Sequence, residues 1–138
     1  MGYEPRFDIP QYDFKKDLAH GEAGETIVSE FLDAISSGSF EVKFDRYRNG
    51  RMAVETDQCP RGKEWKKSGI NVTTATWWVY MFTPSSFIIV AVVRLKNYLR
   101  MNAHVLQKRD LARGENPSKG FLLFPNDIQD MMNNPDYD

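Results

Sequence analysis

Two short segments in which apolar and polar residues alternate place the strongest constraint on how this chain can fold. Residues 40–45 and 52–57 each show this alternation, and Asn49-Gly50 lies between them. Because successive side chains of a strand point to opposite faces, each segment is expected to form a strand with one buried face. Asn-Gly between two such segments favours a tight turn, so the sequence predicts a β-hairpin.

The rest of the chain gives a sequence of helix and strand signals. An apolar period of 3.6 residues predicts a helix over residues 17–36. Residues 74–82 and 87–93 have the composition of buried strands. After them we expect a short basic helix, a polar loop, a strand and a closing helix, with the three regular elements at 94–102, 120–124 and 126–132. The order α-β-β-β-β-α-β-α predicts an α/β fold, a central mixed sheet flanked by helices.

Length and charge limit the class of protein. The chain has 138 residues, the size of one domain, and its polar ends, residues 1–12 and 133–138, are expected to be loose. Eighteen Lys and Arg nearly balance nineteen Asp and Glu, so a polyanion would have to be bound by a local basic patch. A single cysteine fits a reducing compartment. No apolar run is long enough for a signal peptide or a membrane helix. We therefore expect one cytoplasmic domain spanning residues 1–138, without a membrane partner.

Three carboxylates of the predicted hairpin are the first candidate site. If the two strands pair with their polar faces shared, Asp45, Glu55 and Asp57 converge on one side. Like charges that close repel each other unless a proton or a cation lies among them. Oxygen ligands without a Cys or His cluster suit Mg²⁺ or Mn²⁺. The alternative interpretation is an ordinary solvated hairpin face.

Two further groups of charged residues are candidates. Glu25 lies at the margin of the apolar arc of the predicted first helix. A carboxylate is costly there unless it is paired or bound to a metal, although a border residue of an amphipathic helix is the simpler alternative. The loop at residues 59–69 carries cations beside Trp65 that could bind a phosphate backbone or could merely be solvated. These cations are Arg61, Lys63, Lys66 and Lys67.

Taken in order, these residues resemble the PD-(D/E)xK nuclease superfamily, and most closely its small phage-type members related to Holliday junction resolvases. The resemblance covers residues 17–132. It is carried by Gly24-Glu25 and by residues 41–45, 52–57, 67–70, 73–79 and 119–125.

The resemblance implies a restriction-endonuclease-like three-layer fold. In it, Asp45 and Glu55 hold a divalent ion, and Glu25 assists from the helix. The family usually has a lysine two residues after the second acid, where this chain has Asp57. Asp57 would orient water or bind a second ion, and Lys43 could supply the missing positive charge.

A second register remains open, because Glu41-Val42-Lys43 is itself an E-x-K triplet. It lacks an aspartate on a preceding strand and leaves the three-carboxylate cluster unexplained. We therefore favour the register that uses Asp45 and Glu55.

The expected function is Mg²⁺-dependent endonucleolytic hydrolysis of DNA, at branched or junction DNA if the resemblance to resolvases extends to substrate, with Mn²⁺ able to substitute. Arg46 and the four loop cations would hold the DNA backbone. Two symmetric cuts in a junction would require a homodimer. If the chain is phage-encoded, the compartment is the host cytoplasm. The alternatives are a catalytically inactive DNA-binding or assembly module, motivated by Asp57, and a structural protein with a polar hairpin face.

Overall fold

The structure, a computed structural model, describes residues 14–138. The chain divides into two compact units, residues 1–33 and residues 34–138, and each is described by itself. The N-terminal segment that we expected to be loose, residues 1–12, lies outside the described residues.

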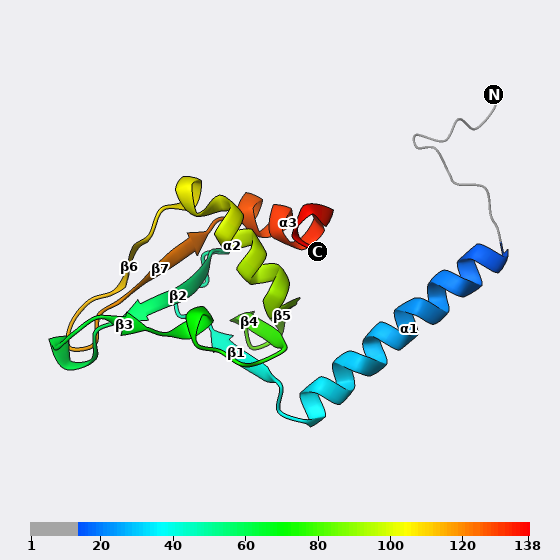
Figure 1. The fold of residues 1–138 in the computed structure, drawn as a ribbon, viewed down its shortest axis with the longest axis horizontal. Coiled ribbons are helices and arrows are strands. Elements are labelled where there is room, and N and C mark those ends of the chain that lie inside the picture. The colour runs from blue at the N-terminus through cyan, green and yellow to red at the C-terminus, as the bar shows by residue number, and fades with distance from the viewer. Residues whose placement is uncertain (1–13) are drawn as a thin grey trace. The chain divides into compact units, whose positions relative to one another are not determined.

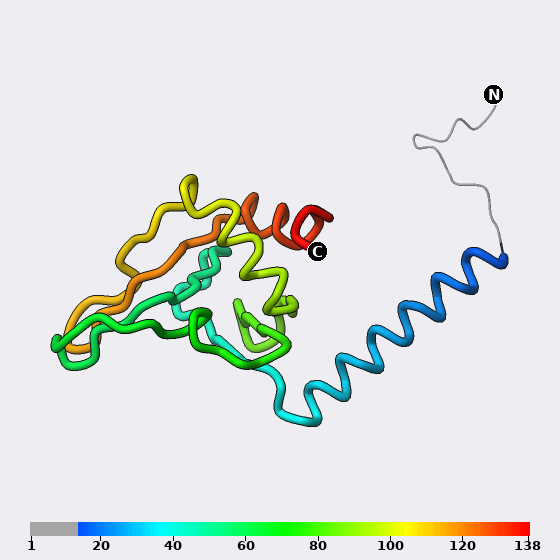
Figure 2. The backbone as a smooth tube through the Cα atoms, in the orientation of Figure 1, coloured from blue at the N-terminus to red at the C-terminus, as the bar shows by residue number. Residues whose placement is uncertain are grey.

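The first unit contains most of one long helix, α1 (Phe14–Ser36). The helix predicted at residues 17–36 is therefore confirmed, and it begins three residues earlier. None of its side chains is buried. Figures 1 and 2 show it as a single uninterrupted helix.

The second unit has two sheets (Figure 1). One has the order β1-β4-β5, with β1 parallel to β4 and β4 antiparallel to β5. The other has the order β3-β2-β7-β6, and all its pairs are antiparallel. The strands are β1 (Phe40–Phe44), β2 (Met52–Gln58), β3 (Lys66–Lys67), β4 (Trp77–Thr83), β5 (Ser86–Ala91), β6 (Arg109–Ala112) and β7 (Ser118–Leu123).

Two helices belong to this unit, α2 (Val92–Leu106) and α3 (Pro125–Asn133). The α/β class predicted from sequence is thus confirmed, but the strands form two sheets where one central sheet was expected. Among residues 14–138, no helix combines the length and the apolar character needed to cross a membrane.

The predicted hairpin between β1 and β2 is wrong. β1 pairs with β4, and β2 pairs with β7, so the two strands belong to different sheets. Gly50 does adopt the positive φ of a turn, +75°. The chain therefore bends at Gly50, but partner choice follows burial: Met52 and Val54 of β2 are completely buried and lie opposite residues of β7.

The core joins α2 to both sheets. The buried apolar residues on β2 and β7 pack in one cluster with those of β4, β5 and α2. Its fully buried side chains include Met52, Val54, Trp78, Leu95 and Leu123.

Several boundaries differ from the predictions. The strand predicted at 87–93 ends at Ala91, because Val92 starts α2, and Val92 and Leu95 then face the core from the helix. The region between the predicted basic helix and last strand contains β6, which the polar composition of residues 109–112 did not signal. The expected loop at residues 59–69 includes the two-residue strand β3.

The C-terminal segment was expected to be loose from residue 133, and this is wrong. Tyr137 is buried, and its ring packs edge-to-face on Tyr98 with centroids 5.0 Å apart. The Tyr137 hydroxyl donates to Asp130 Oδ2 at 2.9 Å. Arg94 of α2 donates to the carbonyls of Met131 and Asn134. Burial of one aromatic ring and these hydrogen bonds hold the end of the chain in place.

Candidate functional site

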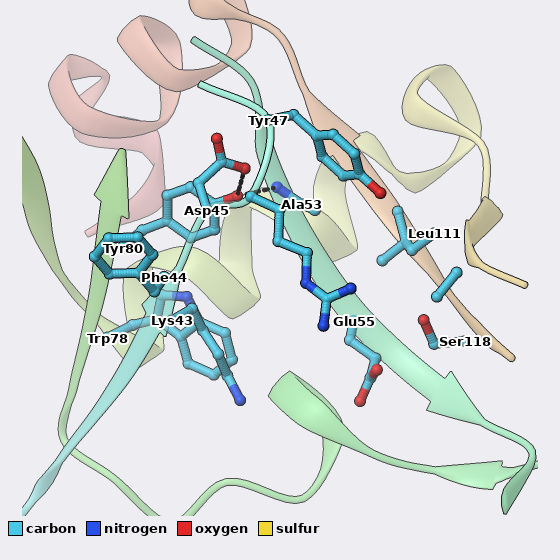
Figure 3. Close-up of a pocket in the computed structure, with 12 residues that line it drawn as sticks. Lys43, Phe44, Asp45, Tyr47, Ala53, Glu55, Trp78, Tyr80, Leu111 and Ser118 are labelled. Carbon is cyan, nitrogen blue, oxygen red and sulfur yellow. Dashed lines mark hydrogen bonds between the residues drawn. The ribbon is translucent and has the colours of Figure 1, made fainter. Parts of the chain in front are cut away.

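A cavity of about 410 Å³ opens where the end of β1 meets β2 and the β6–β7 hairpin. Figure 3 shows the residues that line it. Those with polar or charged side chains are Lys43, Asp45, Arg46, Tyr47, Glu55, Trp78, Tyr80 and Ser118. The cavity thus brings together two of the three predicted hairpin carboxylates and two cations, although the hairpin itself does not form.

Asp45 is fixed at the end of β1. Its N–H donates to the Met81 carbonyl at 2.8 Å, which continues the β1–β4 ladder by one residue. Its carboxylate accepts two hydrogen bonds, one at Oδ1 from the Tyr80 hydroxyl (2.9 Å) and one at Oδ2 from the Arg48 N–H (2.7 Å). Each carboxylate oxygen keeps a further lone pair. Asp45 is therefore a buried, oriented carboxylate that can still accept a ligand.

Tyr80 connects the two sheets at the cavity. Its hydroxyl donates to Asp45 and also accepts from the N–H of Ala53 on β2, at 3.2 Å. Burial raises the pKa of Tyr80 to about 12; the Ala53 N–H acts against this rise and Asp45 adds to it. Tyr80 is therefore a neutral hydrogen-bond donor at neutral pH. Sequence reasoning missed it, although a tyrosine hydroxyl in a predicted buried strand needs a partner and could have been a signal.

Glu55 enters the cavity from β2, and Gly69 lies against its backbone. Gly69 has φ +54°, and a Cβ built on it would lie 2.2 Å from the Glu55 carbonyl oxygen. Only glycine fits this approach. Within residues 14–138, the Glu55 carboxylate has no hydrogen bond or ion pair. In Figure 3 it does not point at the Asp45 carboxylate, which is turned to Tyr80.

A β-bulge separates Asp57 from Glu55. Glu55 lies opposite Gly120 and Asp57 lies opposite Lys119, so one residue of β2, Thr56, has no partner of its own. Gly120 and Lys119 are neighbours on β7 and therefore face opposite sides of the sheet. The bulge turns Asp57 away from the side that Glu55 occupies.

The contacts of Asp57 agree with this register. Its Oδ2 accepts from Lys108 Nζ at 2.8 Å and from the Thr56 hydroxyl at 2.6 Å. The hydrogen bonds from Lys108 and Thr56 lower the pKa of Asp57, against a smaller opposing effect of burial. Asp57 does not line the cavity. The prediction that it shares a face with Asp45 and Glu55 is therefore wrong, and its proposed catalytic role loses its geometric basis.

Lys43 lines the cavity but is already paired. Its ammonium lies 2.8 Å from Glu41 Oε1 and 5.4 Å from the centroid of the Trp78 ring. Burial raises the pKa of Glu41, but hydrogen bonds from Lys43 and Thr73 outweigh it, so the net shift is downward. Glu41 and Lys43 lie two residues apart on β1 and therefore on the same face of that strand. The Glu41-x-Lys43 pair thus forms an ion pair at the edge of the cavity.

One of the remaining predicted site residues lines the cavity, and the four loop cations do not. Arg46 lines the cavity. Lys66 and Lys67 form β3 at the edge of the second sheet, and Arg61 and Lys63 are exposed in the segment before it. None of these four lines the cavity. Glu25 belongs to α1 in the first unit, so its part in a metal site stays a prediction.

The two carboxylates of the cavity are ligands of the kind that hard divalent cations prefer. Within the described part of the chain, no group of three or more His, Cys, Asp or Glu side chains is placed to hold a metal ion. Mg²⁺, however, is commonly held by one or two carboxylates together with water and substrate phosphates. Asp45 and Glu55 supply two such carboxylates from one cavity.

Comparison of the chain with protein-family models, with curated proteins and with solved structures finds no match.

Proposed function

We propose that this protein is a Mg²⁺-dependent endodeoxyribonuclease. The observation that carries the proposal is the placement of Asp45 and Glu55, from two different sheets, in one open cavity with the cations Lys43 and Arg46. Carboxylates that would hold a metal ion and cations that would face a phosphate are the two kinds of group that metal-dependent phosphodiester hydrolysis uses. We also propose that the fold is restriction-endonuclease-like, of the type found in Holliday junction resolvases, and that the protein acts in the cytoplasm.

Each residue of the cavity has a role in this proposal. Asp45 and Glu55 would hold the ion, and Mg²⁺ would polarise a phosphate oxygen and lower the pKa of a water molecule. Tyr80 keeps the Asp45 carboxylate oriented through its hydrogen bond. Arg46 would bind the scissile phosphate, and Lys43, held by Glu41, would stabilise negative charge that develops on it.

Other parts of the chain would bind the rest of the substrate. Arg61, Lys63, Lys66 and Lys67 would contact the DNA backbone, which adds affinity without sequence preference. For a branched substrate, two symmetric cuts would require two copies of the chain.

The test is cleavage of labelled four-way, forked, single-stranded and duplex DNA with Mg²⁺ or Mn²⁺, and with EDTA as the blank. Asp45→Asn and Glu55→Gln are each expected to lower the cleavage rate about 100-fold or more, since each removes a charged ligand. Glu115→Gln, an exposed carboxylate in the β6–β7 loop, is the matched control and is expected to cut like the parent. If both cavity variants cut as fast as the parent, the assignment is wrong.

A second candidate is a DNA-binding or assembly module without cleavage activity. The ion pair of Asp57 with Lys108 favours this candidate. Asp57 stands where the motif usually has a lysine, and in this pair it is not available to the cavity. This candidate predicts DNA retention without cleavage on all four substrates. It also predicts no heat of Mg²⁺ binding by calorimetry, whereas the nuclease predicts heat that Asp45→Asn abolishes.

A further inference from the structure

Five basic side chains from α2 and the β6–β7 region line two adjoining cavities away from the Asp45–Glu55 cavity. We call them the basic strip: Lys96, Arg100, Lys108, Arg113 and Lys119. None of the five lines the Asp45–Glu55 cavity. Only Lys108 lines both cavities of the strip, so it connects them.

The first cavity lies between α2 and the second sheet. Lys96 and Arg100 are one helical turn apart on α2 and reach the same cavity as Lys108. Like charges at this spacing repel each other. The cavity wall also includes the polar residues Thr56 and Asn71. An anion bound here would relieve the repulsion, because it would lie among three cations.

The second cavity continues from Lys108 to Arg113 and Lys119. The Lys119 ammonium lies 4.3 Å from the centroid of the Trp65 ring, a cation–π contact that fixes the end of its side chain. Arg109 also lines this cavity, and its guanidinium lies 5.9 Å from the centroid of the Phe124 ring.

Acidic side chains offset only part of this charge. Asp57 pairs with Lys108, and Asp110 lies opposite Lys119 across the β6–β7 pair. Five cations thus face two carboxylates in a chain whose net charge is −1. The positive charge is therefore local. This agrees with the expectation from the small net charge that a polyanion would be bound by a local basic patch.

The strip is continuous with the basic loop predicted from sequence. The Arg61 N–H donates to Asn116 Oδ1 at 3.0 Å, and the Cys59 N–H donates to the Pro117 carbonyl at 2.8 Å. These bonds hold the segment before β3 against the β6–β7 loop. Two basic segments about 50 residues apart in sequence thereby meet at one end of the second sheet.

We propose that the basic strip binds the phosphate backbone of duplex DNA. A row of cations that runs from a helix to a hairpin loop fits a linear polyanion, which can occupy both cavities at once, better than it fits a single phosphate. Lys and Arg contacts to phosphates position DNA without reading its sequence. The inference rests on the proposed function in one respect, that DNA is the ligand.

The test measures DNA binding without cleavage. The anisotropy of a labelled 30-base-pair duplex is followed in EDTA between 50 and 200 mM salt, with two double variants, Lys96→Gln/Arg100→Gln and Arg113→Gln/Lys119→Gln. Each is expected to raise Kd about 10-fold and to reduce the slope of log K against log salt by about 1–2. Lys15→Gln/Lys16→Gln removes the same charge from α1 and is expected to keep Kd within about twofold of the parent.

Unchanged Kd and salt slope in both strip variants would overturn the proposal. So would polyglutamate that competes with DNA as well as unlabelled duplex does at equal charge, because the partner would then be an acidic protein. The outcome also separates the two proposals. DNA binding that depends on the strip, with no cleavage in Mg²⁺, keeps the strip and refutes the nuclease. Cleavage that depends on Asp45, with strip variants that bind DNA like the parent, keeps the nuclease and refutes the strip.

Discussion

Tyr80 is the residue whose replacement tests the geometry of the cavity most directly. Its hydroxyl makes two hydrogen bonds, to the Asp45 carboxylate and from the Ala53 N–H, and the side chain is buried. Tyr80→Phe removes one oxygen atom and leaves the ring in place. The substitution therefore removes the connection between the two sheets with little change in packing.

The expected cost follows from the two groups that lose their partner. A hydrogen bond to a charged acceptor contributes about 1.5–3 kcal/mol, and the partly buried Ala53 N–H costs less than the about 1–3 kcal/mol of a fully buried N–H when it loses its acceptor. The Arg48 N–H still donates to Oδ2 of Asp45, so the carboxylate keeps one hydrogen bond. We expect Tyr80→Phe to lower the free energy of unfolding by about 2–4 kcal/mol.

Urea unfolding followed by circular dichroism measures this loss as a shift of the midpoint at constant m. The matched control is Tyr47→Phe, because Tyr47 lines the same cavity but is 73% exposed. Its cost is expected to stay within about 0.5 kcal/mol. A Tyr80→Phe loss no larger than that of the control would refute the inference that this hydroxyl ties Asp45 and β2 together.

Two further predictions follow from β2 and its neighbours. Gly69→Ala is expected to lower the free energy of unfolding by more than Gly62→Ala does. Both positions have positive φ, but only at Gly69 would a Cβ clash with another atom, the Glu55 carbonyl oxygen. Equal shifts of the two urea midpoints would contradict this. Asp57→Asn is expected to cost up to about 1 kcal/mol near pH 6, since the ion pair with Lys108 is partly exposed. The pKa of Asp57 is lowered from 3.8 on folding, so this contribution is present above about pH 4 and is lost as pH falls through the lowered value. Urea unfolding of parent and variant at pH 6 and about pH 2 checks the sign, and the same difference at both pH values would contradict it.

Local patterns predicted most of the elements. The helix at 17–36, the strands near residues 40, 52, 77 and 88, and the last helix all occur. These segments have a clear period or a run of β-branched and aromatic residues, and such signals depend only on near neighbours. The errors have local causes too. The polar composition of β6 gave no strand signal, and burial of Tyr137 orders the C-terminal segment, whose other residues are polar.

The candidate site was predicted in part. Asp45, Glu55 and Lys43 line one cavity, yet the reasoning that grouped them relied on a hairpin that does not form. Asp57 was misplaced because the alternation of residues 52–57 gives no sign of the bulge between Glu55 and Asp57. Tyr80 was missed because its partners, Asp45 and Ala53, lie 35 and 27 residues away.

The sequence by itself determined which residues could form strands and helices, how small the net charge is, and which acids and cations are available. It could not determine which strand pairs with which, because alternation requires a buried face but names no partner. Only the tertiary structure decided that β1 joins β4 and β2 joins β7, that one extra residue turns Asp57 to Lys108, and that two distant basic segments meet. These outcomes depend on contacts between residues far apart in the chain, where burial of whole faces outweighs the preference of any single turn.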